Sequence, residues 1–257
     1  MNVLRGLALA FSCFSIVPMP QIEWKGSNMR TLMCFFPFVG IVIGLVLGAW
    51  CWLADAAGFG PALFGAGLAL LPAFVSGGIH LDGFCDVIDA QSSHATPARK
   101  REILQDPHIG AFAAIGVAIY LVAYTALGSE LAPGWQLAVL LGGLHVASRC
   151  LSAIATLTFP TSASKGMLSL FHESGRGAAP LVAVTVELVA CIAIMAIVHP
   201  VAGISIALAG VACLALLYPF ATTQFGGMSG DIAGFFLQVT ELCMLATLVV
   251  VSKVVGL

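Results

Sequence analysis

The sequence has few charged residues and no appended soluble domain. Asp, Glu, Lys and Arg make up 9% of the 257 residues, whereas hydrophobic residues make up 60%. A soluble protein could not solvate so many apolar faces, so the ordinary soluble classes are excluded. Long apolar runs recur from end to end, and about 20 such residues span the hydrocarbon core of a bilayer as a helix. We therefore expect an all-α, polytopic integral membrane helix bundle.

Paired cysteines are also lacking. The eight cysteines lie singly in apolar sequence, and no CxxC pair occurs. This pattern argues against a disulfide framework and against a thiolate metal site, and it favours core cysteines. Internal repeats and low-complexity linkers are lacking too, so we predict a single membrane-embedded domain over residues 1–257.

Seven apolar runs are long enough to be transmembrane helices. We expect them at about 32–54, 62–79, 109–127, 135–158, 180–198, 203–220 and 232–252. The first run carries Gly40, Gly44 and Gly48, whose GxxxGxxxG spacing predicts a smooth face for close helix packing. Residues 3–18 form a shorter run, where we expect an interfacial or re-entrant helix.

The loops between these runs differ in charge. If the spans alternate, one side of the membrane collects the basic residues Lys25, Arg30, Arg99, Lys100, Arg101, Lys165 and Arg176. The opposite loops hold Asp55, Glu130 and His199, with Lys253 as their only base. Basic loops are cytoplasmic by the positive-inside rule. The polar and acidic motifs lie on that same side, so the sequence predicts a substrate site at the cytoplasmic face.

The stretch GGIHLDGFCDVIDA, residues 77–90, is the strongest chemical signal. Asp82, Asp86 and Asp89 recur at i, i+4 and i+7, which places them within a wedge of roughly 60° on a helix. Like charges at this spacing repel unless a cation lies between them. Mg²⁺ typically takes one or two carboxylates together with water and substrate phosphate. We therefore predict a Mg²⁺ site for phosphate chemistry, and the alternative is a polar helix face.

Three further candidates lie near this cluster. His80 precedes it and could act as a general base or as a hydrogen-bond donor to phosphate, with a structural role equally open. Asp106 stands just before a membrane span and is a candidate fourth acidic ligand, where a structural role is again open. Arg99 belongs to a basic run that positive-inside charges would also explain.

Arg149 lies well inside the predicted span 135–158. A guanidinium at this depth must pair or face a wet cavity, and intramembrane charges of this kind are functional by default. We expect Arg149 to contact phosphate or an acidic residue at the site. The alternative is a purely structural ion pair. Glu241 in the last span is the candidate partner.

The segment FGGMSGD, residues 225–231, precedes the last span. Backbone N–H groups of such a loop at a helix N-terminus can hold phosphate. We therefore count Gly226, Gly227 and Asp231 as candidate substrate-binding residues, although the loop lacks the lysine of a Walker A motif.

Four ordered segments carry a family resemblance. They are GGIHLDGFCDVIDA at 77–90, REILQDPHIGAF at 101–112, ASR at 147–149, and GGMSGD at 226–231 followed by Glu241. In their order and spacing the sequence resembles the cobalamin synthase family, the adenosylcobinamide-GDP ribazoletransferases, and the likeness covers most of the chain.

The resemblance implies a late step of cobalamin biosynthesis. A ribose hydroxyl of α-ribazole, or of its 5′-phosphate, attacks the cobinamide-linked phosphate of adenosylcobinamide-GDP, and GMP leaves. Mg²⁺ is the expected cofactor, and the bacterial inner membrane is the expected place. On this interpretation the catalytic residues are His80, Asp82 and Asp86. The metal ligands are Asp82, Asp86, Asp89 and Asp106, and the substrate-binding residues are Arg99, Ser148, Arg149, Gly226, Gly227 and Asp231.

Two positions depart from the family pattern. Ala90 stands where glycine is usual, which is a small steric change. His108 stands where arginine is usual, and this removes a fixed positive charge. Any phosphate-binding role at His108 then depends on a protonated imidazole.

Two rival functions stay open. A CDP-alcohol phosphotransferase also uses helical aspartates, but its DGxxAR pattern is absent because Phe84, Cys85 and Asp86 follow Gly83. A cation or corrinoid transporter would need intramembrane acids along a pathway, whereas here the acids cluster at one face. We expect contacts with membrane lipid and none with nucleic acid, and a homo-oligomer stays open.

Overall fold

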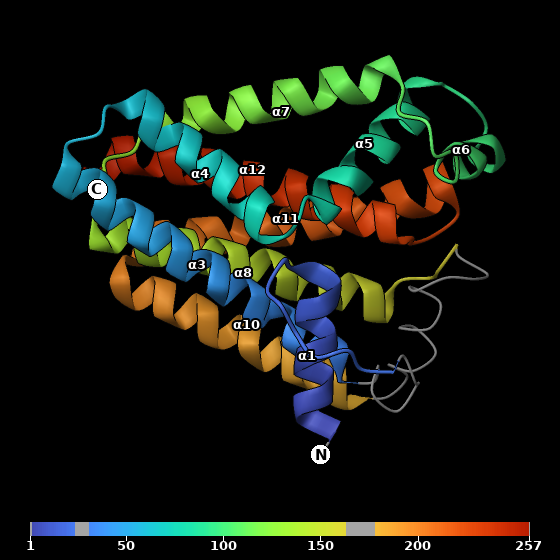
Figure 1. Cartoon of the computed structure of the whole chain (residues 1–257), viewed down its shortest axis with the longest axis horizontal. Helices are drawn as coiled ribbons and strands as arrows, with labels where there is room; N and C mark the ends of the chain where they lie inside the picture. Colours follow the sequence, from blue (N-terminus) through green and yellow to red (C-terminus); the bar gives the residue numbers. More distant parts are fainter. Residues whose placement is uncertain (1, 24–30, 163–177, 257) are drawn as a thin grey trace.

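The apolar runs of the sequence form helices in the computed structural model, which describes residues 2–23, 31–162 and 178–256 (Figure 1). Across those three ranges, helices account for all regular structure apart from one backbone bridge between Thr161 and Met228. The helices are α1 (Asn2–Phe14), α3 (Leu32–Ala57), α4 (Pro61–Val75), α5 (Ile79–Ser92), α6 (Pro97–Ile103), α7 (Ala111–Ser129), α8 (Trp135–Thr158), α10 (Ala178–Val198), α11 (Pro200–Phe225) and α12 (Gly230–Val255).

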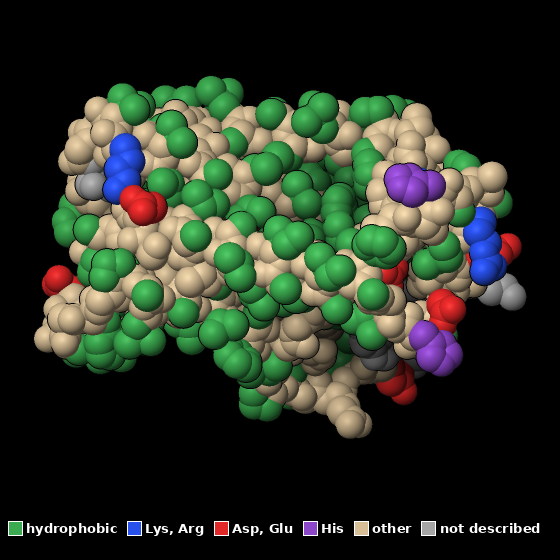
Figure 2. Space-filling model, turned by 90° about the horizontal axis from the view of Figure 1, so that it is seen from above, with side chains coloured by type: hydrophobic (Ala, Val, Ile, Leu, Met, Phe, Trp, Pro, Cys, Tyr) green, Lys and Arg blue, Asp and Glu red, His purple; other side chains and the backbone are tan. Residues whose placement is uncertain are grey.

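Six helices, α3, α7, α8, α10, α11 and α12, are long and apolar enough to cross a membrane. The pair α4 and α5 would make a seventh crossing, broken by a bend of 98°. On the face seen in Figure 2, hydrophobic side chains cover the middle of the molecule and charged side chains gather toward its ends. A bilayer requires this distribution of apolar and charged groups. The predicted all-α, polytopic membrane bundle is confirmed.

The span predicted at 62–79 is wrong in its end point and in its shape. Helix α4 stops at Val75, and its 15 residues extend only about 22 Å at 1.5 Å per residue. Gly77 and Gly78 follow with φ of 64° and 77°, in the left-handed region that glycine adopts without steric cost. The glycine pair of the GGIHLDG motif therefore makes the sharp bend that directs α5 away from α4.

Helix α1 occupies most of the short apolar run at the beginning of the chain and packs against α3. Its 13 residues extend about 20 Å, which is less than the roughly 30 Å of a bilayer core. An interfacial or re-entrant position for this helix stays a prediction.

Helices α3 and α8 pack closely through glycines, as the GxxxGxxxG spacing predicts. A Cβ on Gly40 would lie 2.7 Å from the carbonyl oxygen of His145, and one on Gly44 would lie 2.7 Å from Cα of Gly142. Gly48 is less tightly packed, since a Cβ there would lie 3.9 Å from the Cβ of Ala138. The two backbones thus touch at the first two glycines and separate at the third.

The elements that carry the polar motifs meet at one end of the bundle. In Figure 1, α5, α6, the end of α11 and the start of α12 all lie at the same end, opposite the C-terminus. The predicted convergence of the Asp cluster, the 106–110 stretch and the 221–231 loop is confirmed. Most of the predicted 160–178 loop lies outside the described residues, as do the basic residues Lys25, Arg30, Lys165 and Arg176.

We expect Gly44→Ala to lower the thermal unfolding midpoint of the detergent-purified protein. The added methyl group meets backbone atoms of Gly142, which no rotamer change can relieve, and overpacking of this kind costs about 1–3 kcal/mol. Gly48→Ala is the matched control on the same helix, because its methyl group makes an ordinary contact. Equal midpoints for the two variants would contradict the close packing of α3 on α8.

Candidate functional site

The candidate site forms where α5 crosses the start of α12. A Cβ on Gly83 would lie 2.8 Å from both Cα and the carbonyl oxygen of Asp231, and one on Gly234 would lie 3.0 Å from the carbonyl oxygen of His80. The two backbones therefore touch through glycines. This crossing brings Asp231 beside the acidic face of α5, and sequence reasoning had not recognised Gly83 as the residue that permits it.

The crossing gathers carboxylates from two helices. Asp82, Asp86 and Asp89 lie on α5 as predicted, and Asp86 interacts electrostatically with all three of Asp231, Asp82 and Asp89. Asp82 is exposed, whereas Asp86 and Asp231 are half-buried. Charges of one sign in such proximity favour a bound cation.

The chemistry of these donors fits Mg²⁺, although no cage is preformed. Nowhere in the described residues do three or more His, Cys, Asp or Glu side chains approach closely enough to hold a metal ion. Mg²⁺ is usually bound by one or two carboxylates, with water and substrate phosphate completing its octahedron. Two carboxylates such as Asp82 and Asp86 therefore suffice if a phosphate supplies further oxygens.

Two hollows lie beside α5, and Asp82 lines both of them. The first, which we call the outer hollow, has a volume of about 260 Å³ and is bounded by α5 and residues 104–109. The second, the bundle cavity, has a volume of about 320 Å³ and is enclosed by α1, α3, α5, α8 and the start of α12. Asp86 and Asp106 line the outer hollow, and Asp231 lines the bundle cavity.

Asp106 faces the outer hollow from the turn after α6. Its Oδ1 accepts a hydrogen bond from the backbone N–H of His108 at 3.0 Å and lies 2.7 Å from Nδ1 of the same residue's ring. These hydrogen bonds lower the pKa of Asp106, so the carboxylate is ionised at neutral pH. His108 thus turns back onto Asp106, and the metal-ligand role of Asp106 stays a prediction.

Asp89 has a structural contact that sequence reasoning missed. Its Oδ2 accepts a hydrogen bond from the N–H of Gly110, and its Oδ1 accepts one from the N–H of Ala113 at 2.9 Å. Helix α7 begins after Gly110, which has no side chain with which to cap it, and Asp89 caps that helix from α5 instead. The absence of a capping side chain at Gly110 was the sequence signal that another residue caps α7. Metal ligation by Asp89 would have to use the remaining lone pairs.

The FGGMSGD loop differs from the predicted phosphate cradle. The N–H groups of Gly226, Gly227 and Met228 donate to the carbonyl oxygens of Thr222, Ala221 and Pro160. Phosphate could bind these three donors only by breaking bonds within the protein, so the substrate contacts predicted for Gly226 and Gly227 are not supported. The loop instead closes the C-terminus of α11 and directs Asp231 toward α5.

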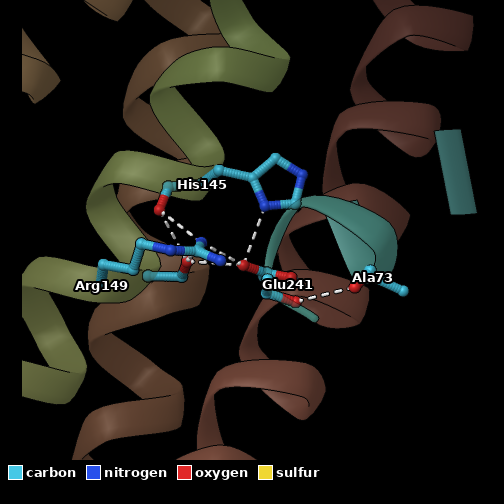
Figure 3. Close-up of polar contacts among 6 residues, drawn as sticks. Ala73, His145, Arg149 and Glu241 are labelled. Atoms are coloured by element: carbon cyan, nitrogen blue, oxygen red, sulfur yellow. Dashed lines mark hydrogen bonds and ion pairs between the residues drawn. The ribbon is translucent and has the colours of Figure 1, made fainter. Parts of the chain in front are cut away.

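Arg149 is held in an internal network (Figure 3). Its Nη1 lies 2.7 Å from Oε1 of Glu241, and the same carboxylate oxygen lies 2.8 Å from Nδ1 of His145 and accepts a bond from the Ser148 hydroxyl at 3.0 Å. Arg149 and Glu241 are only 1% and 2% exposed. The predicted pairing with Glu241 is confirmed. The substrate contacts predicted for Arg149 and Ser148 are not supported, because both side chains already bind this buried carboxylate.

The basic run on α6 mainly joins helices. Lys100 is buried, and its Nζ donates to the side-chain oxygens of Gln91 and Gln224, while Arg101 donates to the carbonyl oxygen of Phe225 at 3.1 Å. These contacts fix α6 against α5 and α11. Arg99 forms an exposed ion pair with Glu102 at 2.6 Å, and its predicted contact with substrate stays a prediction.

Comparison with known proteins identifies the family of the chain. The sequence model described as cobalamin-5-phosphate synthase matches residues 6–249. The chain belongs to the cobalamin-5-phosphate synthase family. It is therefore an enzyme of cobalamin synthesis, as the resemblance implied.

Three relatives illustrate the likeness within the cobalamin-5-phosphate synthase family, and each is named adenosylcobinamide-GDP ribazoletransferase. The protein of Lachnoclostridium phytofermentans is 34% identical over 99% of this chain and 97% of its own length. Those of Clostridium botulinum strain Alaska E43 and Geobacillus kaustophilus are 30% and 29% identical, over 94% and 91% of this chain and 95% and 91% of their own lengths. No solved structure matches the chain.

We expect Glu241→Gln to destabilise the protein strongly. The substitution leaves the Arg149 guanidinium buried without a counter-ion, and breaking a buried pair in this way costs about 3–5 kcal/mol. Glu130→Gln is the control, since the ion pair of Glu130 with Lys253 is more than half exposed and contributes little. The two thermal unfolding midpoints in detergent should differ by many degrees, and a Glu241→Gln midpoint equal to that of the control contradicts a stabilising network.

We expect Asp89→Ala to loosen the beginning of α7. The N–H groups of Gly110 and Ala113 lose their acceptor, and loss of a helix cap costs about 0.5–2 kcal/mol. Hydrogen exchange of residues 110–114 should accelerate in this variant and stay unchanged in Asp82→Ala. Unchanged exchange in both variants would show that Asp89 does not cap α7.

Proposed function

We propose that the chain transfers a cobinamide phosphate from adenosylcobinamide-GDP to a ribose hydroxyl of α-ribazole or its 5′-phosphate. The oxygen–phosphorus bond to the new nucleoside forms, the pyrophosphate bond breaks, and GMP leaves. One observation carries the proposal: carboxylates of α5 and α12 meet at two adjoining hollows in a chain of the cobalamin-5-phosphate synthase family. The same activity stands in the names of the relatives.

Mg²⁺ would be held by Asp82 and Asp86, with Asp231 and Asp106 close by. When bound, it would neutralise negative charge on the transferring phosphoryl group. The proposal rests on the oxygen-rich donor set at the α5–α12 crossing and on the need of these like charges for a cation.

The position of Asp82 supports a meeting point for the two substrates. Because this carboxylate lines both hollows, a hydroxyl in the bundle cavity and a phosphate in the outer hollow can approach each other there. The Asp82 carboxylate can accept a hydrogen bond from the attacking hydroxyl and fix its direction. Positioning of this kind supplies a large part of the catalysis in phosphoryl transfer.

His80 is the second candidate for proton transfer. Its side chain lines the bundle cavity, is 5% exposed, and has a buried Nε2 with no hydrogen-bond partner among the described residues. A substrate hydroxyl could supply that partner. We therefore propose that His80 contacts the nucleophile, as the sequence predicts.

We further propose that the site faces the cytoplasm across the bacterial inner membrane. The basic run of α6 lies at the same end of the bundle as the acidic crossing, which agrees with the positive-inside rule. Family membership disfavours the two rival functions, a phospholipid-forming phosphotransferase and a transporter. Specific lipid contacts and a homo-oligomer stay predictions.

The direct test is release of GMP by the purified protein. Supplied with adenosylcobinamide-GDP, α-ribazole and Mg²⁺, the wild-type protein should release GMP, and EDTA should stop the reaction. Asp82→Asn should lower kcat by at least 100-fold, because it weakens the metal site and the contact with the nucleophile together. Asp55→Asn, in the last turn of α3 at the other end of the bundle, is the control. Failure of the wild type to release GMP would refute the proposed function.

A further inference from the structure

The bundle cavity has an aromatic end. The ring centroids of Phe14 and Phe36 lie 4.3 Å apart, and the His80 ring lies 6.0 Å from the first and 5.7 Å from the second. Met33, one turn before Phe36 on α3, also lines the cavity and is buried. The Arg149 guanidinium lies over the Phe36 ring, 5.9 Å from the ring centroid. This end therefore presents fixed, flat and polarizable surfaces to a ligand.

The cavity lining also includes four polar side chains. Asp82 and Asp231 come from α5 and α12, and Ser152 and Thr156 come from α8. Together they offer carboxylate acceptors and hydroxyl groups that both donate and accept. Such a set suits a molecule with several hydroxyl groups, such as a ribose.

The size of the cavity limits what can enter. Its volume of about 320 Å³ lies near the lower limit of small-molecule sites, which run from roughly 300 to 1,000 Å³. A nucleoside is of this size, whereas a corrinoid joined to a nucleotide is several times larger. Of the two substrates in the proposed function, only the ribazole can lie wholly inside.

The apolar lining also distinguishes one base from another. A guanine edge carries several hydrogen-bonding groups, and Phe14, Phe36 and Met33 would leave them unpaired at a substantial cost in free energy. A benzimidazole-type base keeps one ring nitrogen as an acceptor and is otherwise carbon and hydrogen. With its benzo edge against the aromatic side chains, it leaves fewer polar groups unpaired than guanine would. The aromatic end therefore favours the base of the ribazole over that of GDP.

We propose that the bundle cavity is the acceptor site, with the ribazole base against Phe14, Phe36 and Met33 and its ribose toward Asp82 and Asp231. This inference rests on the proposed function and adds the placement of each substrate. The phosphates of the other substrate then lie in the outer hollow, and the reacting hydroxyl reaches them past Asp82.

Steady-state kinetics of GMP release test the assignment. We expect Phe36→Leu to raise KM for α-ribazole at least tenfold and to leave KM for adenosylcobinamide-GDP within twofold. Phe64→Leu is the matched control, because Phe64 is equally buried but lies on α4 and does not line the cavity. A rise in KM for adenosylcobinamide-GDP alone, or equal rises for both substrates, overturns the assignment.

A second experiment measures binding and begins with the wild-type protein. Equilibrium dialysis of wild-type protein with labelled α-ribazole should show binding that excess GDP does not displace. Ala233→Leu, which fills the cavity from α12, should weaken this binding at least tenfold. Displacement of α-ribazole by GDP, or unchanged binding of α-ribazole to Ala233→Leu, overturns the acceptor-site assignment. If the wild-type protein still releases GMP, the proposed function is unaffected by that result. Absence of GMP release refutes the proposed function itself.

Discussion

A permanent charge inside a membrane bundle constrains the rest of this structure. Arg149 cannot lose its proton, and at 1% exposure it has no water to solvate it. Glu241 neutralises it, and His145 and Ser148 bind the same carboxylate oxygen. Helices α8 and α12 are therefore joined at a defined register. Since α12 carries Asp231 at its start, that register also sets the height of this carboxylate opposite α5.

Arg149 is also connected to the candidate site by a series of side-chain contacts. The guanidinium lies over the Phe36 ring, Phe36 contacts Phe14, and both rings lie near His80 in the wall of the bundle cavity. A buried ion pair is often no more stabilising than a hydrophobic replacement, but it can impose a specific geometry. Here the geometry is the register of two helices and one cavity wall.

Sequence reasoning succeeded where one residue type admits few physical solutions. A guanidinium deep in an apolar run needs an acid, so Glu241 could be named as its partner. Glycines spaced four residues apart indicated the closely packed face of α3, and the lengths of the apolar runs indicated most of the spans.

Prediction from the sequence failed where a structural feature depends on contacts with a backbone segment distant in the chain. The cap that Asp89 provides to α7, the engaged N–H groups of the FGGMSGD loop and the passage of Asp231 past Gly83 all follow from tertiary contacts. The bend at Gly77 and Gly78 was missed because an apolar run shows its length but not its direction.

We propose that acids from α5 and α12 surround one divalent cation, with Asp231 of α12 acting beside Asp82 and Asp86 of α5. Mn²⁺, which can replace Mg²⁺ and is detected by electron paramagnetic resonance, allows its affinity to be titrated in the presence of GDP. We expect Asp82→Asn and Asp231→Asn each to weaken Mn²⁺ binding at least fivefold, and the double variant to lose less than the product of the two effects, because the residues share one ion. Unchanged Mn²⁺ affinity in Asp231→Asn would contradict a site shared between the two helices.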